Sequence, residues 1–388
     1  MVWCRKSGFC FGVIVARRHV EEKELPALYA IVQPGLEPIA ADEITRDLQG
    51  EVKRTGRGLV VFRLPAITPD VVKLRTTEDV FLLAWGSDTL SYRATDLATI
   101  RNWTAKKPDW PYLFKFHHAI RPKTKGKPNF HLVCQMQGEH GYRRIDALDA
   151  LAEGLGGKIP AGWQPAEENA WLEIWLGIEG NTAVCGLRLS DRTMRHRTYK
   201  TEHVAASLRP TVAAAMVRLA GIGPGLVVLD PMCGAGTILA EVIAIANRRR
   251  ARDVRVLGGD IDPNAVFCTR ENLSGVGQAE TARWDATVLP IATESVDRII
   301  SNPPFGKQLS TPEHVGPLYV SAASEWNRVL KPGGRAVLLV GEQDALREAI
   351  RPHGWQPTRQ LKVRVLGQAA VISVWQKPES SPSMSEQF

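Results

Sequence analysis

The segment Val227-Val228-Leu229-Asp230-Pro231-Met232-Cys233-Gly234-Ala235-Gly236-Thr237 decides the fold of this 388-residue chain. A short apolar run ends in an acid, a tight loop with two glycines follows, and a helical pattern starts at Thr237. Glycine suits such a loop because a Cβ would keep the backbone away from a ligand. A dinucleotide-binding fingerprint would require a third glycine at position 239, where this chain has Leu239. The segment therefore predicts a strand, a ligand-binding loop and a helix, without a pyrophosphate site.

The chain around and after this loop alternates between apolar runs and helical patterns. Strands are predicted at 226–229, 254–259, 279–284, 296–301 and 335–340, and helices at 237–247, 263–273, 313–330 and 343–351. This alternation is typical of a doubly wound α/β sheet. Two further strand-like runs, 360–366 and 370–376, are separated by Gly367 and Gln368 and predict a β-hairpin at the end of the sheet.

Acidic residues stand at the ends of three successive predicted strands. Asp230 ends the first strand, Asp260 ends the second, and Asp285 follows the third. Open α/β sheets bind their ligands at the carboxyl ends of the strands. We therefore expect these carboxylates to face one cleft, where the second acid, Asp260 or its neighbour Asp262, can accept hydrogen bonds from both hydroxyls of a ribose.

The run Ser301-Asn302-Pro303-Pro304-Phe305-Gly306 follows the fourth strand. It resembles the (N/D)PP(Y/F) motif of methyltransferases that act on exocyclic amino groups. Such a nitrogen is a weak nucleophile because its lone pair is conjugated into the ring. The side-chain oxygen of Asn302 and the carbonyl of Pro303 can each accept one N–H, which aims the lone pair at the methyl group. The predicted catalytic set is Asn302, Pro303 and Pro304, which form this rigid acceptor, and Phe305, which we expect to stack on the target base.

The glycine loop resembles the DxxxGxG loop of class I S-adenosylmethionine-dependent methyltransferases, and this resemblance implies S-adenosylmethionine as the cofactor. In that family an acid at the place of Asp260 binds the ribose, and one at the place of Asp285 faces the adenine amino group. A covalent cytosine mechanism needs a thiolate nucleophile, whereas Cys233 lies in the glycine loop and is a small structural residue there. The implied cofactor-binding residues are Asp230, Cys233, Gly234, Gly236, Thr237, Asp260, Ile261, Asp285, Ala286 and Asn302.

The chain from about 28 to 377 resembles the THUMP-domain RNA guanine-N2 methyltransferases, in particular the tRNA enzymes. Pro34-Gly35-Leu36-Glu37 is similar to the PGLE start of their ferredoxin-like domain. Arg195-His196-Arg197-Thr198-Tyr199-Lys200 is similar to their basic linker, and Leu208-Arg209-Pro210-Thr211 to the start of the helix that follows it. Members that modify tRNA position 10 usually carry aspartate in the catalytic motif and those that modify position 6 carry asparagine, so Asn302 favours position 6.

The resemblance and the pattern of elements divide the chain into six parts. We expect an N-terminal extension (1–26), a ferredoxin-like α+β domain (27–90), a THUMP RNA-binding domain (91–189), a linker (190–210), a Rossmann-like class I methyltransferase domain (211–377) and a disordered tail (378–388). The tail is rich in Ser, Pro and Glu, a composition that does not form a core. In the N-terminal half, strands are predicted at 28–32, 51–54, 58–62, 130–136, 171–178 and 183–189, and helices at 36–48, 68–74 and 144–154.

Basic residues are concentrated between Arg101 and Lys127, where eight of them stand against Asp109 alone. The aromatic residues interleaved with them are Trp103, Trp110, Tyr112, Phe114 and Phe116. Base stacking combined with phosphate pairing uses this mixture in single-stranded nucleic acid binding, and a solvated loop is the alternative. The predicted RNA contacts are Lys106, Lys107, Lys115, Arg121, Lys123, Lys125, Arg195, Arg197, Tyr199 and Lys200.

The motifs and the resemblance together predict transfer of a methyl group from S-adenosylmethionine to the exocyclic N2 amino group of a guanine in tRNA. The partner expected is the acceptor stem and 3′ end of the tRNA. A paired guanine cannot present its amino group, so we expect the base to flip into the site. A ribosomal RNA guanine-N2 methyltransferase and a DNA or RNA adenine-N6 methyltransferase are the alternatives, because both kinds of enzyme use the same catalytic loop.

The six cysteines bear on metals and on the compartment. They lie far apart, without a CxxC pair or a nearby His doublet, so neither a zinc site nor a disulfide framework is predicted and no metal is needed. A reducing cytoplasm fits this pattern. No run approaches the roughly 18 apolar residues that a membrane helix needs, and residues 1–26 make a poor secretory signal. Nothing in the sequence predicts an obligate protein partner.

Overall fold

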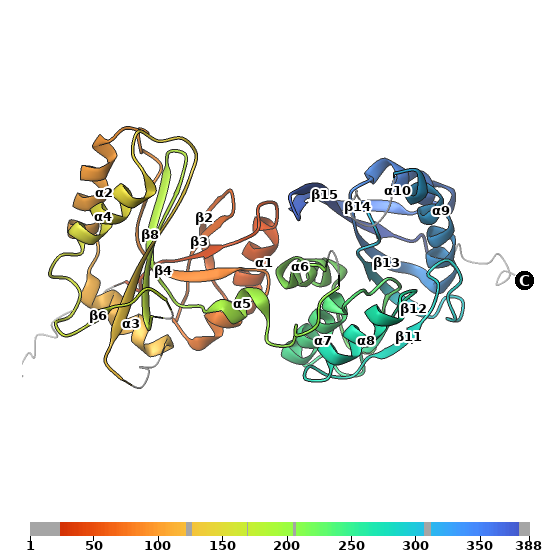
Figure 1. The fold of residues 1–388 in the computed structure, drawn as a ribbon. Coiled ribbons are helices and arrows are strands. Elements are labelled where there is room, and N and C mark those ends of the chain that lie inside the picture. Colours follow the sequence, from red (N-terminus) through yellow and green to blue (C-terminus); the bar gives the residue numbers. More distant parts are fainter. Residues whose placement is uncertain (1–23, 122–125, 169, 205–206, 306–311, 380–388) are drawn as a thin grey trace, which may run out of the picture.

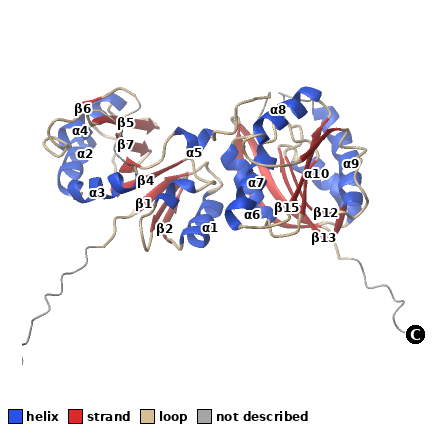
Figure 2. Cartoon of the chain, turned by 90° about the horizontal axis from the view of Figure 1, so that it is seen from below, coloured by secondary structure: helices blue, strands red, loops and turns tan. Residues whose placement is uncertain are grey.

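The computed structural model describes residues 24–121, 126–168, 170–204, 207–305 and 312–379. These residues form two mixed β-sheets with helices packed against them, one sheet from each half of the chain (Figure 1). Helix α6 (Pro210–Ala220) lies between the halves, beside α1 (Glu37–Leu48), in both ribbon views (Figures 1 and 2). Among the described helices, none is long and apolar enough to cross a membrane.

Eight strands form the N-terminal sheet, in the order β2-β3-β1-β4-β8-β7-β5-β6. Its first elements are β1 (Leu28–Ile31), α1, β2 (Glu51–Gly56), β3 (Leu59–Arg63), the 3₁₀ helix η1 (Pro69–Lys73) and β4 (Asp79–Ser87). The order β2-β3-β1-β4 is that of a ferredoxin-like sheet, with η1 in the place of the second helix. The predicted strand, helix and hairpin at the start of this half are therefore confirmed.

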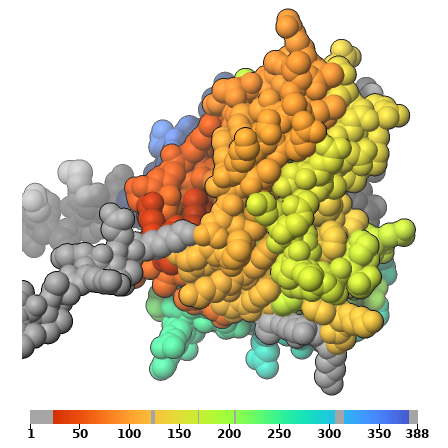
Figure 3. Space-filling model, turned by 90° about the vertical axis from the view of Figure 1, so that its left-hand side faces the viewer, coloured from red at the N-terminus to blue at the C-terminus, as the bar shows by residue number. Residues whose placement is uncertain are grey.

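The same sheet continues into the next segment of the chain. The elements there are α2 (Thr95–Lys106), α3 (Trp110–Ile120), β5 (Asn129–Gln137), α4 (Arg144–Gly154), β6 (Gln164–Pro165), β7 (Leu172–Glu179) and β8 (Thr182–Arg188). Strand β8 pairs antiparallel with β4, for example Leu187 opposite Leu82. On the face seen in Figure 3, the orange and yellow-green segments of this half pack side by side. The two N-terminal modules expected from the sequence therefore share one sheet.

The structure corrects the prediction for the basic aromatic stretch between Arg101 and Lys127. Most of this stretch forms α2 and α3, two helices that the sequence pattern did not predict. Trp110 and Phe114 are only 1% and 6% exposed. The indole Nε1 of Trp110 donates to the carbonyl oxygen of Thr104 at 2.9 Å. These rings belong to the core and are not available to stack on bases, so helix packing explains part of the alternation of basic and aromatic residues.

Seven strands form the C-terminal sheet, in the order β11-β10-β9-β12-β13-β15-β14. Its elements and those that lead into it are α5 (Arg192–His196), α6, β9 (Val227–Asp230), α7 (Thr237–Arg249), β10 (Arg255–Asp260), α8 (Pro263–Leu273), β11 (Glu280–Arg283), β12 (Val296–Ser301), α9 (Pro312–Val329), β13 (Leu330–Val340), α10 (Gln343–Ile350), the 3₁₀ helix η2 (Arg351–His353), β14 (Gln356–Val365) and β15 (Gln368–Gln376). The first five strands of the sheet are parallel, and β15 pairs antiparallel with both β13 and β14. The predicted doubly wound sheet with a terminal hairpin is therefore confirmed.

The position of β9 determines where this sheet can bind a ligand. Strand β10 lies on one side of β9 and β12 on the other, so the winding of the chain changes direction there. Open sheets bind ligands at the carboxyl ends of their strands beside such a switch point. The glycine loop and the catalytic loop follow β9 and β12, and the fold therefore brings them together.

Candidate active site

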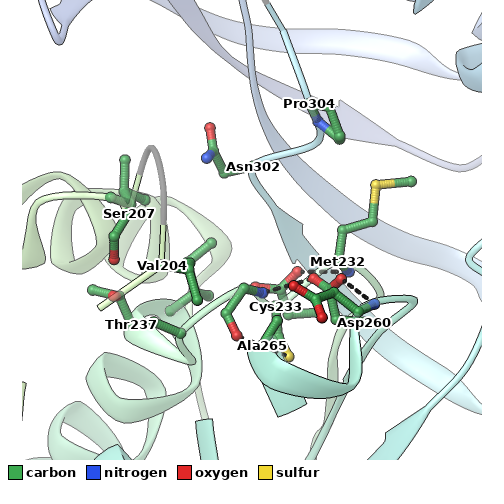
Figure 4. Close-up of a pocket in the computed structure, with 15 residues that line it drawn as sticks. Val204, Ser207, Met232, Cys233, Thr237, Asp260, Ala265, Asn302 and Pro304 are labelled. Carbon is green, nitrogen blue, oxygen red and sulfur yellow. Dashed lines mark hydrogen bonds between the residues drawn. The ribbon is translucent and has the colours of Figure 1, made fainter. Parts of the chain in front are cut away.

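A cavity of about 280 Å³ opens at the carboxyl ends of β9, β10 and β12 (Figure 4). Its walls are the glycine loop, the acidic turn after β10, the loop after β12 and the part of the linker next to α6. The predicted site residues that line it are Asp230, Cys233, Gly234, Thr237, Asp260, Asn302 and Pro304. The predicted residues that do not line it are Gly236, Ile261, Asp285, Ala286, Pro303 and Phe305.

The glycine loop depends on its two glycines for backbone reasons. Gly234 and Gly236 have φ angles of 53° and 73°, in the left-handed region that glycine adopts without strain. A Cβ on Gly236 would lie 2.9 Å from Cγ2 of Thr269 in α8. The hydroxyl of Thr269 donates to the carbonyl oxygen of Gly234 at 2.7 Å. Helix α8 therefore holds one side of the loop, and Gly236 serves this close packing.

Asp260 connects the second strand to the glycine loop. Its Oδ2 accepts the backbone N–H of Gly234 at 2.9 Å, and its Oδ1 accepts that of Asp262 at 3.1 Å. Each carboxylate oxygen has a further lone pair for a ligand hydroxyl. The carboxylate of Asp262 instead caps α8, because it accepts the N–H of Asn264 at 2.9 Å. This arrangement favours Asp260 over Asp262 as the ligand-binding acid.

The third acid, Asp285, follows β11 but does not line the cavity. Asp285 is exposed, and its Oδ1 accepts both the N–H and the hydroxyl of Thr287, at 2.8 and 2.7 Å. Ile261 is 62% exposed, and Ala286 is buried. These three residues lie beyond the lining of the cavity, so the structure gathers the first two acids of the series and leaves the third outside.

Asp230 is the deepest acid of the cavity and is only 1% exposed. Its Oδ1 accepts the hydroxyl of Ser301 at 2.8 Å and the N–H of Met232 at 3.2 Å. Burial raises the pKa of this carboxyl to about 7, although both hydrogen bonds oppose the shift. Burial also raises the pKa of the Cys233 thiol. The thiol therefore remains neutral, as expected of a structural cysteine.

Asn302 carries the acceptor that the catalytic loop needs. Its Oδ1 is buried and has no hydrogen-bond partner within the part of the chain that the structure describes. Figure 4 shows Asn302 across the cavity from Cys233 and Asp260. A buried acceptor without a partner costs free energy that an incoming N–H group recovers. The loop therefore presents an acceptor ready for an amino group.

The remaining residues of the catalytic loop are held by the protein itself. Pro303 is buried, and the carbonyl oxygen of Pro304 accepts the hydroxyl of Tyr319 in α9 at 3.2 Å. The ring of Phe305 lies so close to Gly341 that a Cβ there would be 2.8 Å from Phe305 Cδ2. Phe305 is half-buried and packs against the core, and the structure does not place its ring in the cavity.

The chemistry of the cavity distinguishes between cofactors. Its described lining contains Asp230, Asp260 and Asp262 but no Lys, Arg or His. Negative charges would repel the phosphates of a dinucleotide, whereas they favour a cationic ligand with free hydroxyls. S-adenosylmethionine fits this donor set, because it supplies a methyl group on a cationic sulfur and carries no phosphate. Asp260 would hold its ribose, and Asn302 would stand at its reactive end.

Comparison with known proteins agrees with this geometry. Residues 197–370 match UPF0020, the RMKL-like methyltransferase domain. This match identifies a methyltransferase domain in that part of the chain. The tRNA (guanine(6)-N2)-methyltransferase of Thermus thermophilus is 28% identical over 332 residues, which cover 84% of this chain and 92% of that protein. The human U6 snRNA (guanine-N(2))-methyltransferase THUMPD2 is 37% identical over 217 residues, which cover 55% of this chain and 41% of that protein.

A solved structure extends the likeness to both halves of the chain. The crystal structure of TrmN from Thermus thermophilus matches with a TM-score of 0.73 at 26% identity and covers 90% of this chain and 99% of that one. The predicted class I, S-adenosylmethionine-dependent methyltransferase domain is therefore confirmed, as is the resemblance to the THUMP-domain guanine-N2 enzymes. The chain spans about half the length of the first curated relatives it matches, 53% and 52%.

Basic and aromatic side chains of the linker into the methyltransferase domain contact other groups of the protein instead of solvent. Glu241 in α7 is fully buried, and its Oε1 accepts Nε of Arg197 at 3.1 Å and the hydroxyl of Tyr199 at 2.8 Å. The side chain of Arg197 is only 7% exposed, and burial raises the pKa of Tyr199. Arg197 and Tyr199, which the sequence suggests as RNA contacts, are thus used inside the joint between the two halves.

Two further basic residues of the linker are also paired. Nζ of Lys200 donates to the carbonyl oxygen of Leu208, and burial lowers the pKa of this amine to about 8. Nη2 of Arg195 lies 2.7 Å from Oδ2 of the buried Asp79. Arg195, Arg197, Tyr199 and Lys200 therefore build the joint, although 37% of the Arg195 side chain stays exposed and His196 and Thr198 between them are exposed.

The predicted contacts on α2 and α3 are better placed for RNA. Lys106, Lys107 and Lys115 are exposed, and Nζ of Lys107 lies 4.3 Å above the ring of Trp103. Arg121 is half-buried and donates through Nη1 to the carbonyl oxygen of Ser190 at 3.1 Å. Lys123 and Lys125 lie outside the described residues.

The structure adds a residue to the site that the sequence did not suggest. Asn272 in α8 is buried, and its Oδ1 accepts the N–H groups of Thr201 and Glu202, both at 2.9 Å. Its Nδ2 donates to the carbonyl oxygen of Ala235 in the glycine loop at 2.9 Å. Asn272 therefore ties the linker to the loop. No local signal could have found it, because it lies within an ordinary helical pattern.

Proposed function

We propose that this chain transfers a methyl group from S-adenosylmethionine to the exocyclic N2 amino group of a guanine in tRNA, at position 6 of the acceptor stem. The observation that carries the proposal is the buried Oδ1 of Asn302, which has no hydrogen-bond partner among the described residues, at the edge of an acid-lined cavity. The Thermus thermophilus relative is named for the same base, atom and position.

The residues of the catalytic loop would act by positioning the nucleophile. Oδ1 of Asn302 and the carbonyl of Pro303 each accept one N–H of the amino group, which turns its lone pair towards the methyl donor. The neighbouring proline keeps that carbonyl fixed. The base reaches the loop only after it leaves its pair, so the enzyme flips it out of the helix. The nitrogen would form its bond to the methyl carbon as the C–S bond breaks, S-adenosylhomocysteine would leave with the bonding electrons, and the extra proton on the nitrogen would pass to water afterwards.

The N-terminal half would hold the RNA. In this proposal residues 27–90 form a ferredoxin-like domain, 91–189 a THUMP domain that grips the 3′ end, 190–210 the linker and 211–377 the methyltransferase domain. The exposed Lys106, Lys107 and Lys115 contact phosphates. The chain works in the cytoplasm, where thiols are reduced, and the four cysteines within the described residues are free.

One experiment tests base, atom and RNA class together. The purified protein is incubated with S-adenosylmethionine and, separately, with unmodified tRNA, ribosomal RNA and U6 snRNA, and each product is digested to nucleosides for mass spectrometry. N2-methylguanosine gained in tRNA alone, and mapped to position 6, supports the proposal. The same nucleoside gained in another RNA, or N6-methyladenosine, refutes the substrate and leaves the fold and the catalytic loop in place.

A further inference from the structure

We propose that Ser301 is a positioning residue of the methyl transfer: its hydroxyl, bonded to Asp230, fixes the start of the loop that presents Asn302 to the cavity. This inference rests on the proposed function, because it concerns the same site. It assigns a role to a side chain that precedes the catalytic residues and does not itself line the cavity.

The bond joins the ends of two adjacent parallel strands. Ser301 ends β12 and Asp230 ends β9, and the last backbone register between these strands pairs Ile299 with Leu229. Ser301 is 0% and Asp230 1% exposed, and the hydroxyl lies 2.8 Å from Oδ1. The side-chain bond therefore continues the strand contact past its last backbone pair, up to the residue before Asn302.

A second bond holds the other end of the loop. The hydroxyl of Tyr319, which is 0% exposed, donates to the carbonyl oxygen of Pro304 at 3.2 Å. Among the described residues nothing donates to Oδ1 of Asn302 between these two anchors. The direction of that oxygen is thus set by its neighbours, which leaves the acceptor itself free for the substrate.

The hydrogen bond between Ser301 and Asp230 can be detected through the pKa of Asp230. Two other titratable groups face this carboxylate: Asp260 raises its pKa, and Cys233 is a neutral buried thiol. Burial brings the pKa of Asp230 to about 7, while the hydroxyl of Ser301 and the N–H of Met232 lower it. Removal of the hydroxyl will raise that pKa further. More of the carboxyl will then be neutral at a given pH, and its attraction for a cationic ligand will fall.

Calorimetric titration with S-adenosylmethionine alone tests the signature without RNA. In the wild-type protein the affinity should rise as the pH increases through about 7. In Ser301→Ala the midpoint of that rise should move up by about half a pH unit or more. Ser301→Thr restores the hydroxyl and the midpoint. Tyr319→Phe is the matched control, because it removes the other anchor and leaves Asp230 untouched, so its midpoint should equal that of the wild type.

Single-turnover methyl transfer to tRNA, with both substrates saturating, tests the positioning. Ser301→Ala should be slower by about tenfold or more. Ser301→Thr should return most of the rate, and Tyr319→Phe should be slow with an unshifted midpoint. A Ser301→Ala protein with the wild-type midpoint, whatever its rate, overturns the proposal. So does a shifted midpoint with a wild-type rate.

The test remains decisive if Ser301→Ala fails to fold or if the protein does not methylate tRNA. If Ser301→Ala does not fold, Asp230→Asn replaces it, since this side chain is neutral at every pH. The rise in affinity that is centred near pH 7 should then be lost, and its persistence would overturn the proposal. If the wild-type protein methylates no tRNA, the proposed function fails by itself, while the calorimetric arm still decides whether Ser301 acts on Asp230.

Discussion

Arg75 forms a two-point ion pair with Glu241, in which Nε lies 2.6 Å from Oε2 and Nη2 lies 2.9 Å from Oε1. Arg75 belongs to the N-terminal half, whereas Glu241 lies one turn into α7, the helix that begins at the glycine loop. Burial alone would raise the pKa of Glu241, but Arg197 and Arg75 lower it, so the acid stays charged. An ion pair thus connects the N-terminal half, proposed above to bind RNA, directly to the helix that follows the glycine loop.

Glu241→Ala should destabilise the protein strongly. It leaves the cations of Arg75 and Arg197 with 21% and 7% exposure and without their acid. Breaking a buried pair in this way costs about 3–5 kcal/mol. Urea unfolding measures the change. Glu153→Ala is the control, because its pair with Arg101 is exposed and worth at most about 1 kcal/mol. Equal effects of the two substitutions would contradict a structural role for the joint.

Asn302→Ala and Asp260→Ala should separate catalysis from cofactor binding. Without the Oδ1 acceptor, methyl transfer should slow by about a hundredfold or more, with the cofactor dissociation constant within a few fold. Asp260→Ala should instead raise that constant, both by loss of the ribose acceptor and by release of the Gly234 N–H. Calorimetry and single-turnover rates measure the two effects.

The outcome for a neighbouring acid completes this comparison. Asp262→Ala removes the cap of α8, so it should lower the free energy of unfolding by about 1 kcal/mol and leave cofactor affinity nearly unchanged. Normal cofactor affinity in Asp260→Ala, combined with weak binding in Asp262→Ala, would reassign the ribose contact to Asp262.

Lys107→Ala should weaken RNA binding in a way that depends on salt. One phosphate contact fewer reduces the slope of log K against log salt concentration by about 0.7–0.9. Filter binding of tRNA over a salt series measures it. Arg197→Ala should behave in the opposite manner, with a lower free energy of unfolding and an unchanged slope, because its guanidinium is enclosed in the joint. A reduced slope in Arg197→Ala would return that residue to the RNA surface.

His117 should make the protein sensitive to acid. It is 0% exposed, and burial, together with His118 and Arg121, lowers its pKa from 6.5 to about 3. Between pH 6.5 and about 3, His117 is protonated in the unfolded chain but neutral in the folded one. The free energy of unfolding therefore decreases as the pH falls below about 6.5. Unfolding in urea at several pH values should show a smaller loss in His117→Phe. His196→Gln, at an exposed position, should keep the wild-type slope.

The parts of the fold that sequence patterns predict are those fixed by short-range rules. The glycine loop, the acids at the strand ends and the catalytic loop each depend on a few neighbouring residues. Strand β4 was not predicted, because a continuous apolar run such as Val80 to Trp85 does not distinguish a central strand from a buried helix. Its identity comes from β1 and β8, which pair with it from distant segments.

The parts of the site that were misplaced depend on partners far along the chain. Arg197 and Tyr199 form a basic, aromatic pattern typical of an RNA contact, yet their partner Glu241 stands in a helix more than 40 residues away. In the same way, Trp110 is buried because α3 packs on the N-terminal sheet, whose strands come from distant parts of the chain. The prediction failed because these partners are far apart in the sequence, although the residue types themselves were interpreted correctly as basic and aromatic.

The pairing of β4 with β8 decides how this protein can be divided. A fragment that stopped near residue 90 would lack β8 and expose one edge of β4, whose residues are mostly buried in the whole chain. An open edge of apolar strand recruits other chains and aggregates. The smallest N-terminal piece worth producing therefore runs past Arg188, because the ferredoxin-like strands and the segment after them share one sheet.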